Sequence, residues 1–102
     1  MRYYDNIILD KNIEDIKTLV NSGFGAWGYY AVCVSQKGNG LMEILSLSDA
    51  LKSVNSYKNY GIIAVVKGKS TAEAVAARLI SDWINKNKNL DDFKKYYNVR
   101  CR

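Results

Sequence analysis

The stretch GIIAVVKGKS (residues 61–70) decides the fold predicted for this chain. Its first six residues are continuously apolar, which is typical of a strand that is covered on both faces. A helix follows over about Thr71–Asn87, because Ser70 with Glu73 three positions later matches a capping box. One wide apolar stripe runs along this helix: Ala72, Val75, Ala76, Leu79, Ile80, Trp83 and Ile84. The stretch therefore predicts a buried strand that turns directly into a long amphipathic helix.

Upstream of this stretch, the chain alternates strand and helix signals. Tyr3–Leu9 reads as a strand that ends in β-branched and apolar residues. A helix is expected next, since Ile13, Ile16, Leu19 and Val20 fall at helical spacing, and Gly23 is placed to end it. A glycine-rich connection over residues 24–28 carries two large aromatic side chains.

A hairpin and several shorter elements complete the prediction. Tyr29–Ser35 and Leu41–Leu47 read as two strands joined by a Gly- and Asn-containing turn, and a short helix is expected over Asp49–Val54. After the long helix, Asn89 is placed to cap a last short helix over Leu90–Tyr97. The tail, residues 98–102, is expected to be loose.

The predicted element order is β-α-β-β-α-β-α-α. Such an order indicates an α+β protein with an antiparallel sheet packed by helices, arranged like a ferredoxin-like sandwich with extra C-terminal helices. At 102 residues the chain is the size of one domain, so residues 1–102 are expected to form a single α+β domain. The fold class alone leaves function open, because unrelated functions share such folds.

Composition restricts the class of protein and its chemistry. Hydrophobic residues make up 48% and charged residues 25%, values that exclude intrinsic disorder and a disulfide-stapled miniprotein. The chain has no histidine, so catalysis by imidazole and metal ligation by imidazole are excluded. Two cysteines without histidine do not supply the four ligands of a structural zinc site in a monomer. We therefore expect no metal, no cofactor and no enzymatic activity.

The two cysteines and the hydropathy pattern suggest a compartment. Cys33 lies in an apolar run and is expected to be a small buried hydrophobe. Cys101 stands between Arg100 and Arg102, whose charge favours a thiolate, so it is expected to be reactive if it is exposed. No apolar run approaches the roughly 18 residues of a membrane span, and the N-terminus lacks the apolar region of a signal peptide. Together these features suggest a reducing cytoplasm and no membrane.

Positive charge is concentrated in the second half of the chain. The net charge is +5, with −2 over residues 1–51 and +7 over residues 52–102. A basic half favours an anionic partner such as a nucleotide, a nucleic acid or an acidic protein face. A lysine-rich surface that merely aids solubility explains the same numbers.

Two groups of residues are candidate anion-binding sites. The first group lies where the strand over residues 61–66 joins the long helix, and its residues Gly68-Lys69-Ser70 resemble the end of a phosphate-binding P-loop. The first glycine of a P-loop is replaced here by Ile63, so a P-loop NTPase is rejected. A helix N-terminus flanked by lysines still attracts anions. The alternatives are a plain Ser70 cap and a hydrated helix end. The candidate ligand-binding residues are Lys67, Lys69, Ser70, Thr71, Lys94, Lys95, Arg100 and Arg102.

Tyrosines form the third candidate feature. The chain has eight, including three adjacent pairs, and neighbours on a strand point to opposite faces. Outward rings stack on bases or contribute to protein interfaces, although they also pack at the edge of a core. The candidate stacking or interface residues are Tyr3, Tyr29, Tyr96 and Tyr97. Glu43, in mid-strand, would need a partner such as Arg78 if it faced the core.

Two functions remain open at this point. The first is a small non-catalytic protein that holds a nucleotide or nucleic acid through its basic half and its tyrosines. The second is a protein-binding inhibitor or subunit, acting on a host factor or on its own copy through a tyrosine-rich surface. A composition without proline and rich in Lys, Asn, Ile and Tyr suggests an AT-rich genome and an accessory protein of a phage or mobile element.

Overall fold

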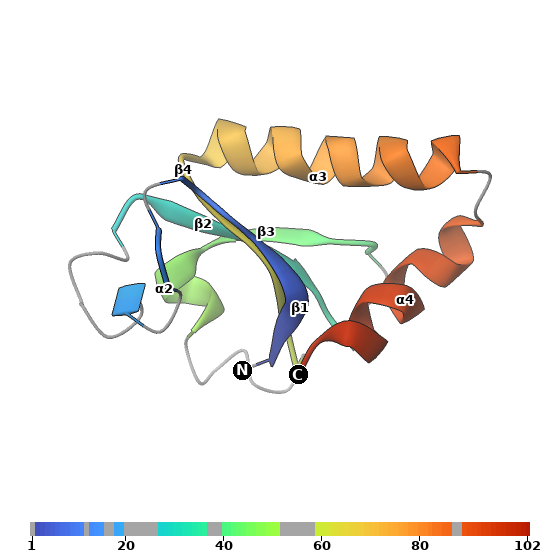
Figure 1. Cartoon of the computed structure of the whole chain (residues 1–102), viewed down its shortest axis with the longest axis horizontal. Coiled ribbons are helices and arrows are strands. Elements are labelled where there is room, and N and C mark those ends of the chain that lie inside the picture. Colours follow the sequence, from blue (N-terminus) through green and yellow to red (C-terminus); the bar gives the residue numbers. More distant parts are fainter. Residues whose placement is uncertain are drawn as a thin grey trace.

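The computed structural model describes residues 2–11, 13–15, 18–19, 27–36, 40–51, 59–86 and 89–102. Four strands and four helical segments lie within these ranges (Figure 1). The strands are β1 (Arg2–Leu9), β2 (Tyr29–Val34), β3 (Glu43–Ser46) and β4 (Gly61–Lys67). The helices are α2 (Leu47–Ala50), α3 (Lys69–Asn85), the 3₁₀ turn η3 (Leu90–Asp92) and α4 (Phe93–Arg100). The predicted α+β class and the element order are therefore confirmed within the described part of the chain.

The strands form one mixed sheet in the order β1-β4-β2-β3. β2 pairs antiparallel with both β3 and β4, as the predicted hairpin requires. β1 pairs parallel with β4, so the sheet is not wholly antiparallel as predicted. Parallel neighbours need a long connection between them, and the whole hairpin with its flanking segments separates these two strands in the chain.

A bulge in β4 places two consecutive residues on the same face of the sheet. Cys33 lies opposite Ile62 and Val32 lies opposite Ala64, which leaves Ile63 as an extra residue on β4. Ile63 and Ala64 both contribute to the core on the side of α3 and α4, whereas Ile62 contributes to the other core. All apolar residues of β4 are buried, as its sequence predicts.

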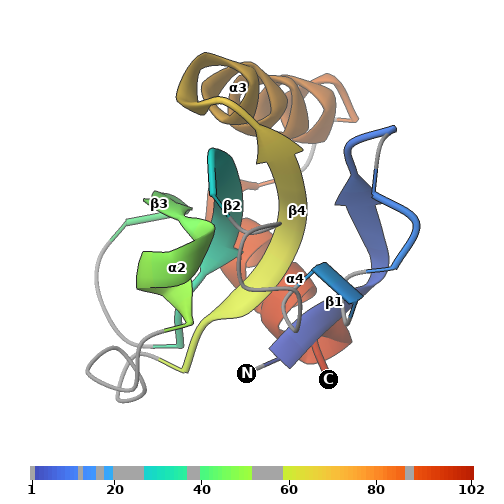
Figure 2. The ribbon, with the colours of Figure 1, turned by 90° about the vertical axis from the view of Figure 1, so that its left-hand side faces the viewer.

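Helices cover both faces of the sheet (Figure 2). On one side, Ala72, Val75 and Ala76 of α3 pack on β2 and β4, and α4 joins them beside Trp83. On the other side, α2 and the described residues Ile13 and Leu19 cover the sheet. A ferredoxin-like sandwich has helices on one face of its sheet, and here the two extra C-terminal helices of the prediction, α3 and α4, cover the other face. Because β4 is apolar on both faces, each face needs its own cover.

Some predicted elements have different bounds or fall outside the description. α3 begins at Lys69 after Gly68, so Ser70 lies inside its first turn and is not its cap. The predicted helix from Ile13 to Val20, the hairpin turn and the end of the Asp49–Val54 helix lie largely outside the described residues. Within the described residues, no helix is both long enough and apolar enough to span a membrane.

The C-terminal tail is docked, contrary to the expectation that it is loose. α4 continues to Arg100, and Cys101 is buried and forms an antiparallel bridge with Tyr4. Tyr3 and Arg102 exchange two backbone hydrogen bonds of 2.8 and 2.9 Å. The open edge of β1 supplies the backbone partners that a free tail would lack.

Candidate ligand-binding site

The predicted anion-binding residues form two groups that lie far apart. Lys67, Lys69, Ser70 and Thr71 surround the junction between β4 and α3. The other four, from Lys94 to Arg102, belong to α4 and the residues that follow it, below the sheet in Figure 1 and away from this junction. The two groups are therefore separate candidate sites and do not form one basic surface.

Gly68 makes the turn from β4 into α3. Its φ of 86° is a conformation that residues with a Cβ rarely adopt. Its N–H donates to the Gly28 carbonyl at 2.9 Å, and its carbonyl accepts from Ala72 N–H at 3.2 Å. No described side chain caps the helix at Gly68. The first-turn amides of Lys69, Ser70 and Thr71 therefore point out of the helix end, where they attract anions.

The charge around this helix end is mixed but mainly positive. Lys67 and Lys69 are exposed, and the first turn of α3 has no acidic residue. The Asp10 carboxylate accepts a hydrogen bond from Lys67 N–H at 3.2 Å, so one negative charge also lies at the junction. Two lysines and the positive end of the helix dipole oppose this single carboxylate.

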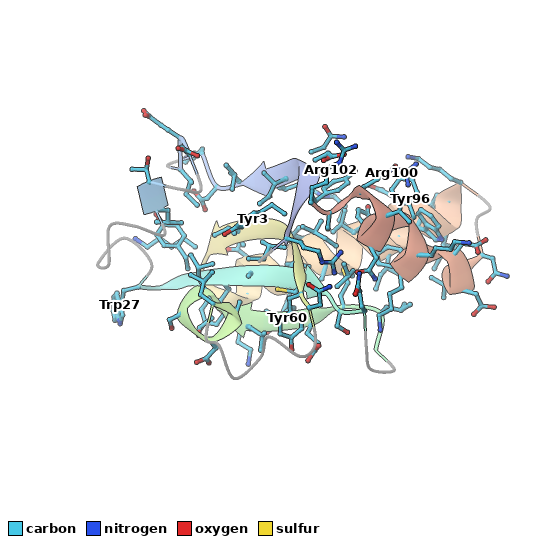
Figure 3. The ribbon with its side chains drawn as sticks, turned by 90° about the horizontal axis from the view of Figure 1, so that it is seen from below. Tyr3, Trp27, Tyr60, Tyr96, Arg100 and Arg102 are labelled. Atoms are coloured by element: carbon cyan, nitrogen blue, oxygen red, sulfur yellow. The ribbon has the colours of Figure 1, made fainter. Side chains whose placement is uncertain are left out.

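A surface pocket of about 290 Å³ opens beside the junction. Its lining comes from the start of β2 and the end of β3 with α2: Trp27, Gly28, Tyr29, Tyr30, Ser46 and Ser48. Trp27 is 86% exposed and projects from the end of the molecule opposite α4 (Figure 3). We call this the aromatic pocket.

Strand register places the aromatic pocket next to the helix end. Tyr29 pairs with Lys67 across β2 and β4, and the Gly28 carbonyl accepts from Gly68 N–H. Tyr30 pairs with Ser46 of β3, so the other wall of the pocket comes from the β2–β3 hairpin. Gly28 has a φ of 81° with open space around it, which lets the chain turn into β2 directly after Trp27.

Two serine hydroxyls line the pocket. Ser46 Oγ accepts from Asp49 N–H at 3.2 Å and thereby caps α2. Ser48 Oγ lies 3.4 Å from Ser46 Oγ and belongs to an exposed residue. A hydroxyl both donates and accepts, so the pair offers polar contacts beside the aromatic rings.

The predicted tyrosines have different environments. Tyr29 is half-buried and lines the aromatic pocket. Tyr3 packs against the core on the α2 side, and burial raises its pKa. Tyr97 is 7% exposed, and burial raises its pKa to about 12. Tyr96 is half-buried under Arg100, whose Cζ lies 3.7 Å from the centre of the Tyr96 ring. Tyr97 is thus a core residue, and Tyr29 and Tyr96 remain candidates for ligand contact.

Neither cysteine is an exposed reactive thiol. Cys33 is fully buried as predicted, and burial, with Glu43 and Cys101 as smaller causes, raises its pKa to about 12. Cys101 is buried too, and its pKa is raised because burial outweighs the lowering effect of Arg2. The prediction of a reactive Cys101 required exposure and does not hold.

Glu43 is half-buried on β3, directly opposite Cys33. This pairing places its side chain on the α2 side of the sheet, whereas Arg78 belongs to α3 on the other side, so Arg78 is not its partner. Among the described residues, no group of three His, Cys, Asp or Glu side chains is placed to hold a metal ion.

Sequence reasoning missed most of the aromatic pocket. Trp27 was noted only as part of a glycine-rich connection, and Ser46 and Ser48 come from a different part of the chain. The Trp27-Gly28 pair directly before a strand is a local signal in the sequence, but the strand register that brings the serines to it cannot be read from local sequence. Comparison with protein-family models, curated proteins and solved structures finds no match for this chain.

Proposed function

We propose that this protein binds a nucleotide without transforming it. The observation that carries the proposal is the contact between the aromatic pocket and the start of α3, through the 2.9 Å hydrogen bond from Gly68 N–H to the Gly28 carbonyl. A pocket lined by aromatic rings and serine hydroxyls beside a positively polarised helix end suits a molecule that joins a base to a phosphate.

Each part of the ligand has a place in this proposal. The base stacks on Trp27 and Tyr29, since aromatic rings bind every base through its π face. The Ser46 and Ser48 hydroxyls serve the polar edge of the base or the sugar. The phosphate lies against the first-turn amides of α3 between Lys67 and Lys69. The pocket volume is near the lower end of the range for small-molecule sites, which favours a mononucleotide.

Calorimetric titration tests this proposal. Ribonucleoside monophosphates are expected to bind more tightly than the matching nucleoside or inorganic phosphate alone, because only the nucleotide uses both parts of the site. Trp27→Ala and Lys69→Ala are each expected to weaken nucleotide binding by about tenfold, which is in the range of one stacking contact or one charge-assisted contact. Ile84→Ala and Arg78→Ala, at exposed positions of α3, serve as matched controls that leave binding unchanged.

The absence of any nucleotide binding at millimolar ligand would contradict the proposal. Equal losses in the Arg78→Ala control and the Lys69→Ala variant would show that general charge, and not the start of α3, attracts the ligand.

A second candidate function is binding to another protein, as an inhibitor of a host factor or as a subunit. The 86% exposure of Trp27 favours it, because large aromatic side chains are enriched at protein interfaces. Salt separates the two functions. Phosphate binding falls steeply as salt rises, whereas a complex held by apolar contacts survives. Free thiols at both described cysteines suit a reducing cytoplasm, and an accessory protein of a phage fits either function.

A further inference from the structure

The surface where α4 meets β1 carries a rigid aromatic and cationic stack. Tyr96 is held on two sides, with its ring 5.1 Å from the ring of Trp83 and 5.1 Å from the ring of Tyr97, both in edge-on geometry. Trp83 and Tyr97 are buried in the core, so the orientation of the Tyr96 ring is set from beneath. Such edge-on pairs are the favoured arrangement of aromatic rings.

Arg100 lies over this ring. Its Cζ is 3.7 Å from the ring centre, and Nη1 donates to the Tyr96 carbonyl at 3.1 Å. Arg100 is nevertheless an exposed residue, so the guanidinium face turned away from Tyr96 is open to solvent. Because two contacts already hold the side chain, a ligand that binds to that face pays little conformational entropy.

Further positive charge lies nearby. Lys95 precedes Tyr96 and is exposed, and Arg102 follows Arg100 along the same side of the molecule (Figure 3). Within the described chain, no carboxylate forms an ion pair with Arg100 or Lys95. Arg102 pairs with Asp5 at 3.5 Å, but side-chain exposures of 82% and 42% make this a weak, screened contact.

Besides Asp5, which pairs with Arg102, two acidic residues directly precede α4 in the chain. Asp91 and Asp92 precede Phe93, roughly 12 Å along the helix axis from Arg100 at 1.5 Å per residue. Lys94 and Lys95 follow these two carboxylates in the first turn of α4, and Arg100 lies in its last turn. The Arg100 guanidinium is therefore at the end of α4 away from Asp91 and Asp92.

We infer that the Tyr96–Arg100 stack, with Lys95 and Arg102 beside it, binds single-stranded nucleic acid. A base stacks on the open face of the Arg100 guanidinium, and the neighbouring phosphates contact Lys95 and Arg102. A single strand fits because its bases are accessible for stacking, whereas those of a duplex are covered by their neighbours. An acidic protein segment would use the charges but not the planar face. This surface is independent of the aromatic pocket, which lies at the opposite end of the molecule (Figure 3).

Fluorescence anisotropy with a labelled oligouridine of about 12 nucleotides tests the inference at about 50 mM salt and at higher salt. Binding is expected to weaken as salt rises. Arg100→Ala is expected to reduce the affinity for oligouridine about tenfold. Arg100→Lys is expected to cause most of the same loss but to leave the salt dependence of binding unchanged, because lysine keeps the positive charge and lacks the planar guanidinium. Arg78→Ala removes an equal charge from the exposed surface of α3 and is expected to have little effect.

Three results would overturn the inference. They are no binding at low salt, equal losses for Arg78→Ala and Arg100→Ala, and competition by polyglutamate as effective as that by unlabelled oligouridine. Circular dichroism checks that the Arg100 variants are folded. Lys95→Ala is a second variant at an exposed position, and it must also reduce the affinity for oligouridine in the same assay. Trp27→Ala is expected to retain oligouridine binding while losing mononucleotide binding, so failure at one site is distinguishable from failure at the other.

Discussion

Gly61, the first residue of β4, lies directly beneath Cys101. A Cβ added at Gly61 would lie 2.5 Å from the Cys101 Sγ and 2.8 Å from its Cβ, closer than real Cβ contacts. The backbone bridge between Cys101 and Tyr4 holds this side chain in place. Gly61 is therefore needed for the close approach of the C-terminal residues and not for an unusual backbone angle.

We expect Gly61→Ala to destabilise the protein by about 1–3 kcal/mol, the usual effect of overpacking a filled site. Urea denaturation followed by circular dichroism measures this change. The double variant Gly61→Ala with Cys101→Gly removes both close contacts and is expected to be less destabilised than the sum of its single variants. Strict additivity in that cycle would contradict the proposed contact.

Local sequence alone predicted the burial of one of the two cysteines. Cys33 was expected to be buried because it lies in an apolar run, and it is fully buried. Cys101 was expected to be loose because it lies in the C-terminal tail, and it is buried as well. The local sequence of Cys101 is polar, and its burial follows from a partner about 40 residues upstream.

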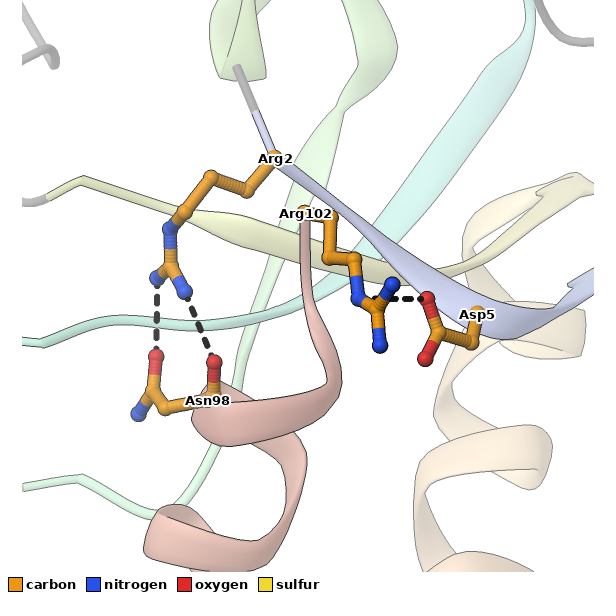
Figure 4. A network of polar contacts seen from close by, with 4 residues as sticks. All are labelled: Arg2, Asp5, Asn98 and Arg102. Carbon is orange, nitrogen blue, oxygen red and sulfur yellow. Dashed lines mark hydrogen bonds and ion pairs between the residues drawn. The ribbon is translucent and has the colours of Figure 1, made fainter.

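At the scale of elements, a hydrogen-bond network attaches α4 to the rest of the molecule (Figure 4). The Arg2 guanidinium donates to Asn98 Oδ1 at 2.8 Å and to the Asn98 carbonyl at 3.1 Å. Asn98 Nδ2 donates to the carbonyls of Ser35 and Lys94 at 3.1 and 3.0 Å. Arg2 also donates to Asn59, so the network as a whole joins α4 to β1, to the end of β2 and to the residues before β4.

We expect Asn98→Leu to loosen α4 and to destabilise the protein by about 1–3 kcal/mol, because it leaves partly buried polar groups without partners. Hydrogen exchange of the α4 amides is expected to accelerate more than exchange of the β4 amides. Val99→Ala, at the exposed neighbouring position, is the control and should leave exchange unchanged. Unchanged exchange in Asn98→Leu would show that the apolar contacts of Phe93 and Tyr97 hold the helix without this network.

Element prediction succeeded where hydrophobic periodicity is strong. The apolar run of β4 and the apolar stripe of α3 each identified an element within about two residues of its observed bounds. The cap of α3 was wrong, because Ser70 and Glu73 matched a capping box while Gly68 made the turn with a positive φ. A side-chain cap pattern says nothing about the backbone angle before it, which the tight β4–α3 connection determines here.

For the molecule as a whole, burial of weakly acidic groups affects how stability depends on alkaline pH, and Cys33 and Tyr97 have the largest raised pKa values. Burial raises the pKa of Cys33 from 9.0 and that of Tyr97 from 10.0, each to about 12. Both groups are neutral when protonated, and the unfolded chain loses these protons at a lower pH than the folded protein. The stabilising effect of the buried neutral groups is therefore full below about pH 9 and is lost as the pH rises toward 12.

We expect the free energy of unfolding to fall steadily as the pH is raised from 9 toward 12. Denaturant titrations over this range measure it, with absorbance of tyrosinate as an independent readout of titration. Tyr97→Phe removes one titrating group while keeping the ring, so it is expected to show a shallower fall than the parent protein above pH 10. An identical pH dependence in the two proteins would contradict the assigned role of Tyr97.

The candidate sites, like the fold, could be predicted from the sequence only in part. Sequence reasoning identified Lys67, Lys69 and the Tyr96–Arg100 region from charge and residue type. It did not predict that these groups lie apart, nor that Trp27 and Ser46 form one pocket beside the start of α3. The register of the sheet and the direction of β1 determine which of these residues lie close together. Local sequence does not predict this, because register depends on pairing between segments that are distant in the chain.

By itself, the sequence determined the α+β class, the burial of β4 and the amphipathic α3, because each follows from the local periodicity of apolar side chains. Only the tertiary structure decided the parallel pairing of β1 with β4, the docking of the C-terminal residues and the aromatic pocket. These features arise from contacts between segments tens of residues apart, and no local pattern encodes which distant partner a strand or side chain will find.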